Sequence, residues 1–565
     1  MSEETETSPK VAIGISFGNS YSSIAWTSSE GKASVIANEE GDRQIPTVLS
    51  YVEGEEFQGT QAKAQLVRNP TNTVAYFRDY LGKSFKSIDP TPSHASAHPI
   101  EEADSVVFSI KDKETPEANA VACDEIVTRH LRRLAKSAGD YLGNSVTAAV
   151  MTVPTDFTDA QKAALDKAAS DAGLQVLQFI HEPVAALLAY DARTTDSAPQ
   201  DKIVVVADLG GTRSDVAVIA SRGGMYTILA TAHDYELGGS NLDDVLIDYA
   251  AKDFQKKNKT DPKANARSLA KLKLEAEAVK KSLSLGASAI FGIESLADGI
   301  DFSLSVNRTR YELLANKVFA QFTQLIQTAV QKADLDVLDI DEIILAGGTS
   351  HTPKIARNLE SAFPESTTVM APATNSTSLN PSELAARGAA IQASLVAEFE
   401  KEDIEQSTHA AITNAPHTTK AIGVIVKNAS GDDVFTPIVA AQTAVPVRKT
   451  AQIAAAGHVL VRLCEGEREI KVTKPEPKPK AEKTEEDSDE DDDSEDDEDE
   501  DEEIRERIWK AGSPLAEAAV KGVKKGGKVE VQINVSAELG VTLVVREVGG
   551  KGGVRGELKP AQNGA

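Results

Sequence analysis

The chain has 565 residues and is strongly acidic, with 60 lysines and arginines against 87 aspartates and glutamates and a formal net charge of −27. That length predicts more than one domain and a large buried core, whereas so acidic a surface argues against direct binding to nucleic acid or to anionic membranes. The excess is uneven, because residues 485–503 hold 17 acids and no base while the rest of the chain holds 60 bases against 70 acids, a net charge of −10.

The N-terminus and the cysteine content argue against further classes of protein. The first ten residues, MSEETETSPK, have neither a basic start nor an apolar stretch, so no signal peptide is expected. No apolar run approaches the ~20 residues that span a bilayer. Cys123 and Cys464 are too few for a disulfide framework or a cysteine metal site. We therefore expect a cytoplasmic protein.

Residues 11 to about 400 alternate short apolar, β-branched runs with amphipathic stretches. Strands are expected at 11–15, 147–153, 202–208 and 342–347. Helices are expected, from apolar residues that recur at intervals of three and four, at 124–142, 158–172, 240–257, 263–284, 309–332 and 380–399. Strands interleaved with helices predict an α/β domain over residues 1–400 with largely buried sheets.

The pattern changes in the last third of the chain. Residues 401–417 lack clear periodicity and are expected to form a linker. Strand patterns follow at 421–428, 434–440, 458–466, 529–537 and 540–548, which predicts a smaller β domain over 418–565. The strand pattern is interrupted from about 474 to 525. The interruption begins with KPEPKPKAEK and continues into the acidic run, so a disordered insertion is predicted at about 474–504.

Two segments about 190 residues apart, 11–26 and 204–219, share a plan of apolar strand, glycine-containing turn and second strand. The repeat predicts two halves of one duplicated domain. Backbone N–H groups in such a turn can bind phosphate oxygens, and glycine allows the anion to approach closely. Either turn alone could be only a tight hairpin. The candidate phosphate-binding residues are Gly18, Asn19, Ser20 and Tyr21 in the first half and Gly210, Gly211 and Thr212 in the second.

A third glycine pair, Gly347-Gly348, with Thr349 after it, ends a predicted strand and precedes a helix expected from Pro353. A helix N-terminus there would allow a ligand to approach, although a plain strand-to-helix turn explains the pattern equally well. No GxGxxG motif follows a strand. The nearest P-loop match, at 522–528, is followed by Val529 where Ser or Thr must bind magnesium, and we interpret it as a loop.

Blocks in the same order over almost 400 residues resemble the seventy-kilodalton heat-shock chaperone family. They include IANEEGDRQIPTVLSY (36–51), NPTNTV (69–74), VPTDFTDAQKAAL (153–165), HEPVAALLAY (181–190), DLGGTRSDV (208–216), LGGSNLD (237–243), GGTSHTPKI (347–355) and NPSELAARGAAIQA (380–393). VPVRKT and LCEGERE resemble the start of the family's peptide-binding sandwich. The resemblance implies a duplicated actin-like ATPase domain followed by a β-sandwich, here without the family's helical lid.

The resemblance also allows the phosphate site to be compared position by position. The family Asp that helps to hold magnesium is Ser16, its catalytic Lys is Arg78, and the Thr of its second loop is Arg213. The family acids are retained at Glu182, Asp208 and Asp215, of which Asp208 would hold magnesium through water. Losing a group aimed at transition-state charge can cost about 10²–10³-fold, and a planar guanidinium does not replace a compact ammonium. We therefore expect no catalytic residues, and ATP binding with poor or no hydrolysis.

The adenosine end resembles the family more closely. Glu277, Lys280, Lys281 and Ser284 match the family helix that lines adenosine. The Arg that packs on adenine in the family is His351 here, and an Asp nearby is Ser382. ATP is therefore the expected cofactor, while the case for magnesium is open.

The remaining departures concern coupling and partners. Residues 401–417 lack the family's apolar linker, so ATP-driven communication with a peptide pocket is not expected. Together the departures resemble the atypical fungal member that pairs with the J-domain protein zuotin in the ribosome-associated complex. This implies a chaperone-like subunit in a stable heterodimer with a J-domain protein, which reaches the ribosome through that partner and assists a ribosome-bound chaperone of the same family with nascent chains.

Two other functions stay open from the sequence. One is an active peptide-binding ATPase chaperone, and the other is a nucleotide-exchange factor for another family member. The acidic run also has two interpretations: a solvated disordered loop, or a contact with a basic partner that phosphorylation at Ser488 or Ser494 would tune.

Overall fold

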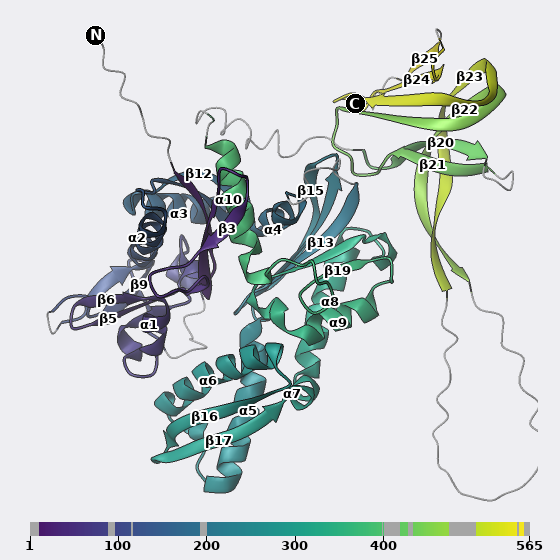
Figure 1. The fold of residues 1–565 in the computed structure, drawn as a ribbon. Helices are drawn as coiled ribbons and strands as arrows, with labels where there is room; N and C mark the ends of the chain where they lie inside the picture. The colour runs from purple at the N-terminus through teal and green to yellow at the C-terminus, as the bar shows by residue number, and fades with distance from the viewer. Residues whose placement is uncertain are drawn as a thin grey trace, which may run out of the picture. The chain divides into compact units, whose positions relative to one another are not determined.

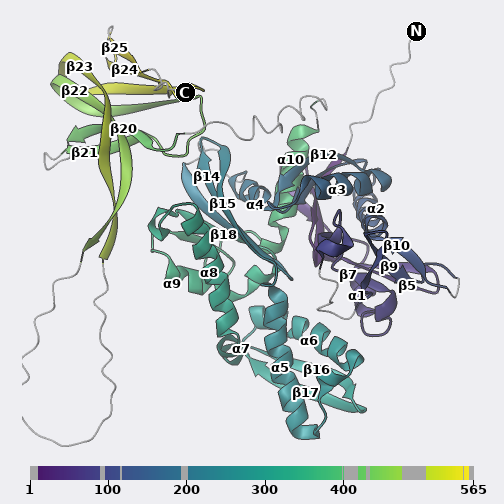
Figure 2. The ribbon, with the colours of Figure 1, turned by 180° about the vertical axis from the view of Figure 1, so that it is seen from behind.

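The computed structural model describes residues 11–88, 96–114, 117–192, 201–397, 399, 418–427, 433–473, 504–550 and 553–558. The chain divides into two compact units, residues 1–413 and 414–565, and each is described by itself (Figure 1, Figure 2). The expected linker at 401–417, and the insertion expected at about 474–504 apart from its last residue, lie outside the described residues.

The first half of the first unit, here called the first lobe (residues 11–192), is built on one mixed sheet in the order β12-β11-β1-β2-β3, with β4 beside β2. Its strands are β1 (Ala12–Phe17), β2 (Tyr21–Thr27), β3 (Ala33–Ile36), β4 (Ile45–Pro46), β11 (Ala148–Val153) and β12 (Gln175–His181). All six residues of β11 are buried, as expected for a central parallel strand with both faces covered. The helices of this lobe are α1 (Gly59–Ala64), α2 (Cys123–Leu142), α3 (Asp159–Asp171) and α4 (Glu182–Asp191).

Two smaller sheets complete the first lobe. One consists of β5 (Val48–Val52), β6 (Glu55–Gln58) and β7 (Thr73–Ala75), and the other of β8 (Pro99–Glu102), β9 (Ser105–Ile110) and β10 (Asn119–Ala122).

The second lobe (residues 201–383) contains a sheet with the same plan. Its order is β15-β14-β13-β18-β19, formed by β13 (Lys202–Leu209), β14 (Ser214–Arg222), β15 (Met225–Asp234), β18 (Glu342–Ala346) and β19 (Thr368–Met370). In both sheets the strand before the glycine turn pairs parallel with one neighbour and antiparallel with the strand after the turn. The repeat of strand, turn and strand in the sequence therefore corresponds to a repeated sheet topology.

The rest of the second lobe is helical apart from one hairpin. The hairpin is β16 (Ser288–Ala297) and β17 (Ile300–Asn307), and the helices are α5 (Gly239–Asn258), α6 (Ala266–Leu285), α7 (Arg308–Leu314), α8 (Asn316–Lys332) and α9 (Pro353–Ala362). The single helix expected at 309–332 is wrong, because the chain breaks at Ala315 between α7 and α8. The break brings the buried rings of Tyr311 and Phe319 to 5.9 Å in an edge-to-face arrangement.

Helix α10 (Leu384–Val396) packs against β1 and against α4 through two glycines. A Cβ at Gly14 would overlap the backbone nitrogen of Ala390, and a Cβ at Gly388 would overlap the carbonyl oxygen of Ala185. The backbones of the sheet and the two helices therefore meet at a distance that no side chain permits. Figure 1 shows α10 running beside β3 and α4 in the middle of the first unit.

The second unit is one antiparallel sheet in the order β21-β20-β22-β23-β24-β25. Its strands are β20 (Ala421–Lys427), β21 (Asp433–Val439), β22 (Val447–Thr473), β23 (Ile504–Val535), β24 (Val541–Glu547) and β25 (Gly553–Leu558). Valines, isoleucines and leucines of β20, β22, β23 and β24 form its core.

Two expectations for this unit are wrong. Residues 504–525 do not continue the interruption, and residues 522–528 are not a loop, because β23 runs through both. Its first residue, Ile504, pairs with Thr473, the last of β22. Among the described residues of this stretch, Ala518 and Val523 belong to the buried core, but the lysines and glycines at 521–528 obscure the alternation from which strands are predicted. None of the described helices combines the length and apolar content needed to cross a bilayer.

We predict that Gly388→Ala lowers the free energy of unfolding of the first unit by about 3 kcal/mol or more, because the new methyl group must displace backbone rather than a flexible side chain. Thermal unfolding of the full chain measures the effect. Gly292→Ala is the matched control, since a Cβ at Gly292 meets nothing within 4 Å. Equal unfolding midpoints for the two variants would show that α10 does not depend on this close approach.

Candidate functional site

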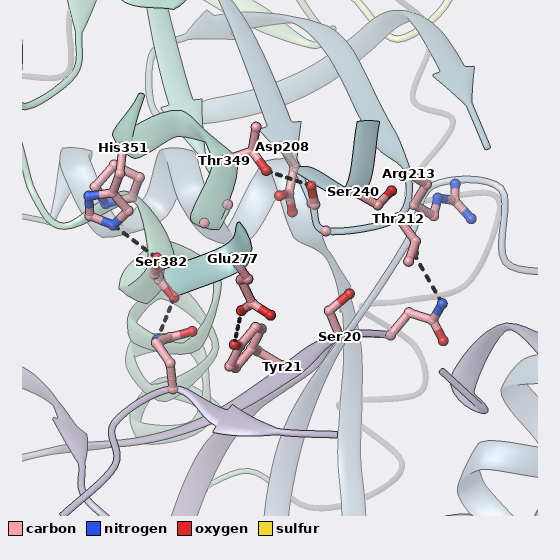
Figure 3. A pocket seen from close by; sticks show the side chains of 18 of the residues that line it. Ser20, Tyr21, Asp208, Thr212, Arg213, Ser240, Glu277, Thr349, His351 and Ser382 are labelled. Carbon is pink, nitrogen blue, oxygen red and sulfur yellow. Dashed lines mark hydrogen bonds between the residues drawn. The ribbon is translucent and has the colours of Figure 1, made fainter. Parts of the chain in front are cut away.

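A cavity of about 450 Å³ lies between the two lobes of the first unit (Figure 3). Every residue singled out from the sequence for nucleotide binding lines it: Gly18, Asn19, Ser20, Tyr21, Gly210, Gly211, Thr212, Glu277, Lys280, Lys281, Ser284, Gly347, Gly348, Thr349 and His351. The degenerate or retained positions of the phosphate site line the same cavity: Ser16, Arg78, Glu182, Asp208, Arg213 and Asp215, with Ser382 at the other end. Residues that are hundreds of positions apart in sequence therefore share one cavity.

The two glycine turns face each other across this cavity. Each is closed by a backbone hydrogen bond, Gly18 N to Tyr21 O at 3.1 Å and Gly210 N to Arg213 O at 3.0 Å. Asn19 Nδ2 donates to Thr212 Oγ1 at 3.2 Å, which joins one turn to the other. A Cβ at Gly211 would overlap the Ser20 hydroxyl. This close approach leaves backbone exposed in the cavity, as a phosphate-binding turn requires.

At Gly347, in the third glycine pair, the surrounding atoms also leave no room for a side chain. Gly347 has φ +82°, and a Cβ there would lie 2.5 Å from Asp208 Oδ1. A short helical turn (Gly348–His351) follows, and α9 begins at Pro353. Thr349 Oγ1 donates to Gly210 O at 2.8 Å and so ties this turn to the second glycine turn (Figure 3).

At the end of the cavity where the sequence predicts the phosphates, here called the phosphate end, Arg78 is buried among carboxylates. Its Nη1 lies 3.2 Å from Glu182 Oε1 and its Nη2 lies 2.7 Å from Asp79 Oδ1. Burial raises the pKa of Glu182 strongly, and the charges of Asp208 and Asp215 add to this effect while Arg78 opposes it. Burial and the neighbouring Asp215 likewise raise the pKa of Asp208. The guanidinium is thus held by fixed partners rather than standing free.

Arg213 engages the other retained acid. Its Nε donates to Asp215 Oδ2 at 2.8 Å, and His233 Nδ1 lies 2.8 Å from Asp215 Oδ1. Burial favours the neutral acid, but the hydrogen bond from His233 and the charge of Arg213 outweigh it, so the pKa of Asp215 lies below its ordinary value. Ligand atoms of Asp156, Asp215 and His233 come within 4.8 Å of one another, as in a metal site. Arg213 bonds to both carboxylates, so a cation is already present there.

The end of the cavity where the resemblance predicts adenosine, here called the adenosine end, contains a network of contacts of which the sequence predicted only part. Lys63, from α1, places its Nζ 2.5 Å from Glu277 Oε2 and 2.7 Å from Tyr21 Oη. Lys281 Nζ lies 2.9 Å from Glu277 Oε1. Burial would raise the pKa of Glu277, but the two lysines hold it well below its usual range. Lys63 belongs to no motif, and only its place across the cavity from α6 reveals it.

Asp243 is the second residue that sequence reasoning missed, although it ends the LGGSNLD block. Its Oδ2 accepts from Lys280 Nζ at 2.8 Å, while its buried Oδ1 has no hydrogen-bond partner among the described residues. Burial raises the pKa of Asp243 to about 6 even though Lys280 opposes the shift. An unpaired acceptor in the cavity wall fits a ligand that carries hydroxyl or amino donors, as a nucleoside does.

His351 and Ser382 close this end of the cavity. His351 Nε2 lies 3.0 Å from Ser382 Oγ, and Gln44 Nε2 from the first lobe donates to Ser382 O at 2.9 Å (Figure 3). Burial lowers the pKa of His351, so its ring is neutral near pH 7. A flat neutral ring suits packing against a base better than it suits a phosphate.

Two sheets with the same strand topology enclose a glycine-lined cavity, and comparison with known families assigns the chain that has this arrangement to one family. Residues 12–476 match the profile of the Hsp70 protein, and the chain belongs to the Hsp70 family, which implies nucleotide binding. It is 45% identical to ribosome-associated complex subunit SSZ1 of Saccharomyces cerevisiae, over 97% of this chain and 99% of that protein. It is 44% identical to a heat shock protein 70 homolog of Schizosaccharomyces pombe (97% and 95%) and 34% identical to heat shock 70 kDa protein 14 of Xenopus tropicalis (79% and 86%).

We predict that Asp243→Asn changes how stability depends on pH. The folded protein holds a proton on Asp243 up to a pKa of about 6, above the ordinary value of 3.8, so the contribution of Asp243 to wild-type stability falls as pH rises through that window. Relative to wild type, the variant should gain about 2–3 kcal/mol of unfolding free energy between pH 4 and pH 7. Denaturant unfolding without nucleotide at both pH values checks this. Asp248→Asn, on the exposed side of the same helix, is the control, and a pH-independent difference for Asp243→Asn would contradict the prediction.

Proposed function

We propose that this protein binds ATP in the cavity and hydrolyses it poorly or not at all. The observation that carries the proposal is the state of the two arginines at the phosphate end: Arg78 is held by Glu182 and Asp79, and Arg213 is held by Asp215. A guanidinium fixed by neighbouring carboxylates keeps its charge and gives up no proton, so it can attract phosphate without activating water. The fixed cations therefore favour binding over turnover.

In this proposal, different groups of residues contact the phosphates, the nucleoside and the base of ATP. Backbone N–H groups of the two glycine turns bind the phosphates, and the turn at Gly347 admits them. Asp243 and the Glu277–Lys280–Lys281 face of α6 accept and donate around the nucleoside, while His351 packs against the base. Magnesium would neutralise charge on the phosphate oxygens, and Asp208 would hold it through water. Ser16 offers no carboxylate for that role, so the metal is less firmly held than ATP.

The larger organisation follows from the family. We propose that residues 1–400 form a duplicated actin-like ATPase domain and residues 418–565 a β-sandwich-like domain without a helical lid, joined by the linker at 401–417. The likeness to subunit SSZ1 supports the same cellular role: a cytoplasmic, chaperone-like partner in a stable complex with a zuotin-like J-domain protein, which acts at the ribosome beside a ribosome-bound chaperone of the family. The outer edges of β21 and β25 suit strand addition by that partner.

We predict that phosphate release from radiolabelled ATP stays at background in wild type, and that Ser16→Asp, Arg78→Lys and Arg213→Thr together raise it about 10–100-fold. Single changes should do little, because groups that act as a unit in catalysis are strongly non-additive. Single-turnover assays with tight-binding ATP measure the step. Ser16→Asp with Arg213→Thr, lacking the lysine, is the matched control. Wild-type turnover equal to that of an ordinary family member would refute the proposal.

We predict that affinity purification of the full chain from its own cells yields a J-domain protein in a one-to-one ratio together with unhydrolysed ATP. Mass spectrometry of the protein and nucleotide fractions gives both ratios. The acidity of the chain predicts that ribosomes are recovered only while that J-domain partner is present. A lone monomer that turns over ATP would instead support an active peptide-binding chaperone, and capture of a second family member without a J-domain protein would support nucleotide exchange.

A further inference from the structure

A second set of contacts joins the two lobes, away from the adenosine end. Asp156 follows β11 in the first lobe, whereas Arg213 and Tyr235 belong to the second lobe, beside β14 and after β15. Arg213 Nη2 donates to Asp156 Oδ1 at 2.9 Å, and Tyr235 Oη donates to Asp156 Oδ2 at 2.6 Å. The Arg213 guanidinium lies over the Tyr235 ring, 4.6 Å from its centroid. Asp156 is therefore bound through both oxygens to the opposite lobe.

Arg213 is positioned for this contact by its own lobe. Its Nε and Nη2 bind Asp215, which His233 also contacts, and the His233 ring stacks on Tyr235 with centroids 6.3 Å apart. Residues of β14 and β15 therefore fix the guanidinium independently of its contact with Asp156. A rigid guanidinium that bonds to residues of both lobes holds the lobes together more firmly than two flexible side chains would.

We infer that Asp156, Arg213 and Tyr235 form an interlobe bridge that holds the lobes together beside the phosphates and slows the release of bound nucleotide. The inference rests on the proposed function, since it assumes that the cavity binds ATP. The cavity lies between the lobes, so separating them would open it, and separating them here would expose Arg213, whose side chain is 9% exposed, without its Asp156 partner. The ion pair of Lys63 and Glu277 joins the lobes at the adenosine end, so contacts between the lobes lie at both ends of the cavity.

The bridge can be broken without altering the cavity wall. Arg213 lines the cavity, but Asp156 and Tyr235 are not among the described residues that do. In Asp156→Asn and in Tyr235→Phe, Arg213 keeps its bonds to Asp215 and its own charge. Tyr235→Phe changes no charge, whereas Asp156→Asn removes the negative charge that pairs with Arg213, and the extra net positive charge would attract the phosphates and slow release, against the expected effect. Tyr235 is 59% exposed, and solvent-exposed contacts contribute less than shielded ones. Asp156→Asn should therefore have the larger effect.

The first test is the dissociation rate of a fluorescent ATP analogue, chased with excess ATP in a stopped-flow instrument. We expect dissociation to be about tenfold faster in Asp156→Asn and about threefold faster in Tyr235→Phe, with little change in association rate. The double variant should match Asp156→Asn alone, because both changes act through one carboxylate. Asp171→Asn, which removes an exposed pair with Lys167 inside the first lobe, is the control. Unchanged dissociation in both variants, with normal unfolding midpoints, would overturn the inference.

The second test needs no nucleotide. Dyes on Tyr141→Cys and Leu313→Cys report the distance between the lobes, because these exposed positions lie one on each lobe and the native cysteines are buried. The bridge predicts a broader distance distribution in Asp156→Asn and Tyr235→Phe than in wild type. If wild type failed to bind ATP, the proposed function would fail, yet this measurement would still decide whether the bridge holds the lobes. An identical distribution in all three proteins would show that it does not.

Discussion

The close approach of backbone to backbone is the constraint on which the first unit depends. Gly14 and Gly388 let β1, α4 and α10 meet without intervening side chains, and Gly211 and Gly347 do the same around the cavity. Interiors are packed to the density of organic crystals, so a methyl group at Gly14, Gly388 or Gly347 would have to displace backbone, and one at Gly211 would have to displace the Ser20 side chain. The glycines therefore do two tasks: they set the distance between the sheets, and they leave backbone groups bare where a phosphate can reach them.

Around the cavity, acidic side chains lie next to lysines and arginines. At the adenosine end two lysines hold Glu277 ionised, while at the phosphate end burial favours the protonated forms of Glu182 and Asp208. Removing one member of a buried pair leaves an uncompensated charge, which is far more costly than the pair itself is stabilising. This explains how an arginine can stand at position 213 without disrupting the fold: Asp215 and Asp156 are there to receive it. Arg213 thereby forms a structural contact between the lobes.

Much of the first unit could be predicted because it obeys simple patterns. The strands at 148–153 and 202–209 are apolar runs buried on both faces, and most of the cavity-lining residues singled out from the sequence lie in blocks with a recognisable order. Lys63 and Tyr235 lie in no such block, and Asp156 lies in one that gives no sign of its role, since each of the three acts through a partner more than 50 residues away. The break at Ala315 depends on where Tyr311 and Phe319 meet in the core. The length of β23 depends on pairing with β22, which needs no alternation of apolar residues. Tertiary contacts decide these features, and local periodicity does not record them.

The distribution of acids is the last consequence of this arrangement. Residues 485–503 lie between Thr473 and Ile504, which are paired partners at the ends of β22 and β23. The chain therefore leaves and re-enters the sheet at one place, and the entropy of closing a loop rises only slowly with its length. A long acidic segment can be carried there without changing any described contact of the second unit. The 17 acids of that run account for most of the net charge, whereas Asp156, Asp215, Asp243 and Glu277, in or beside the cavity wall, each contact a lysine or arginine. The acids that contribute most to the net charge and the acids around the cavity are thus different residues in different units.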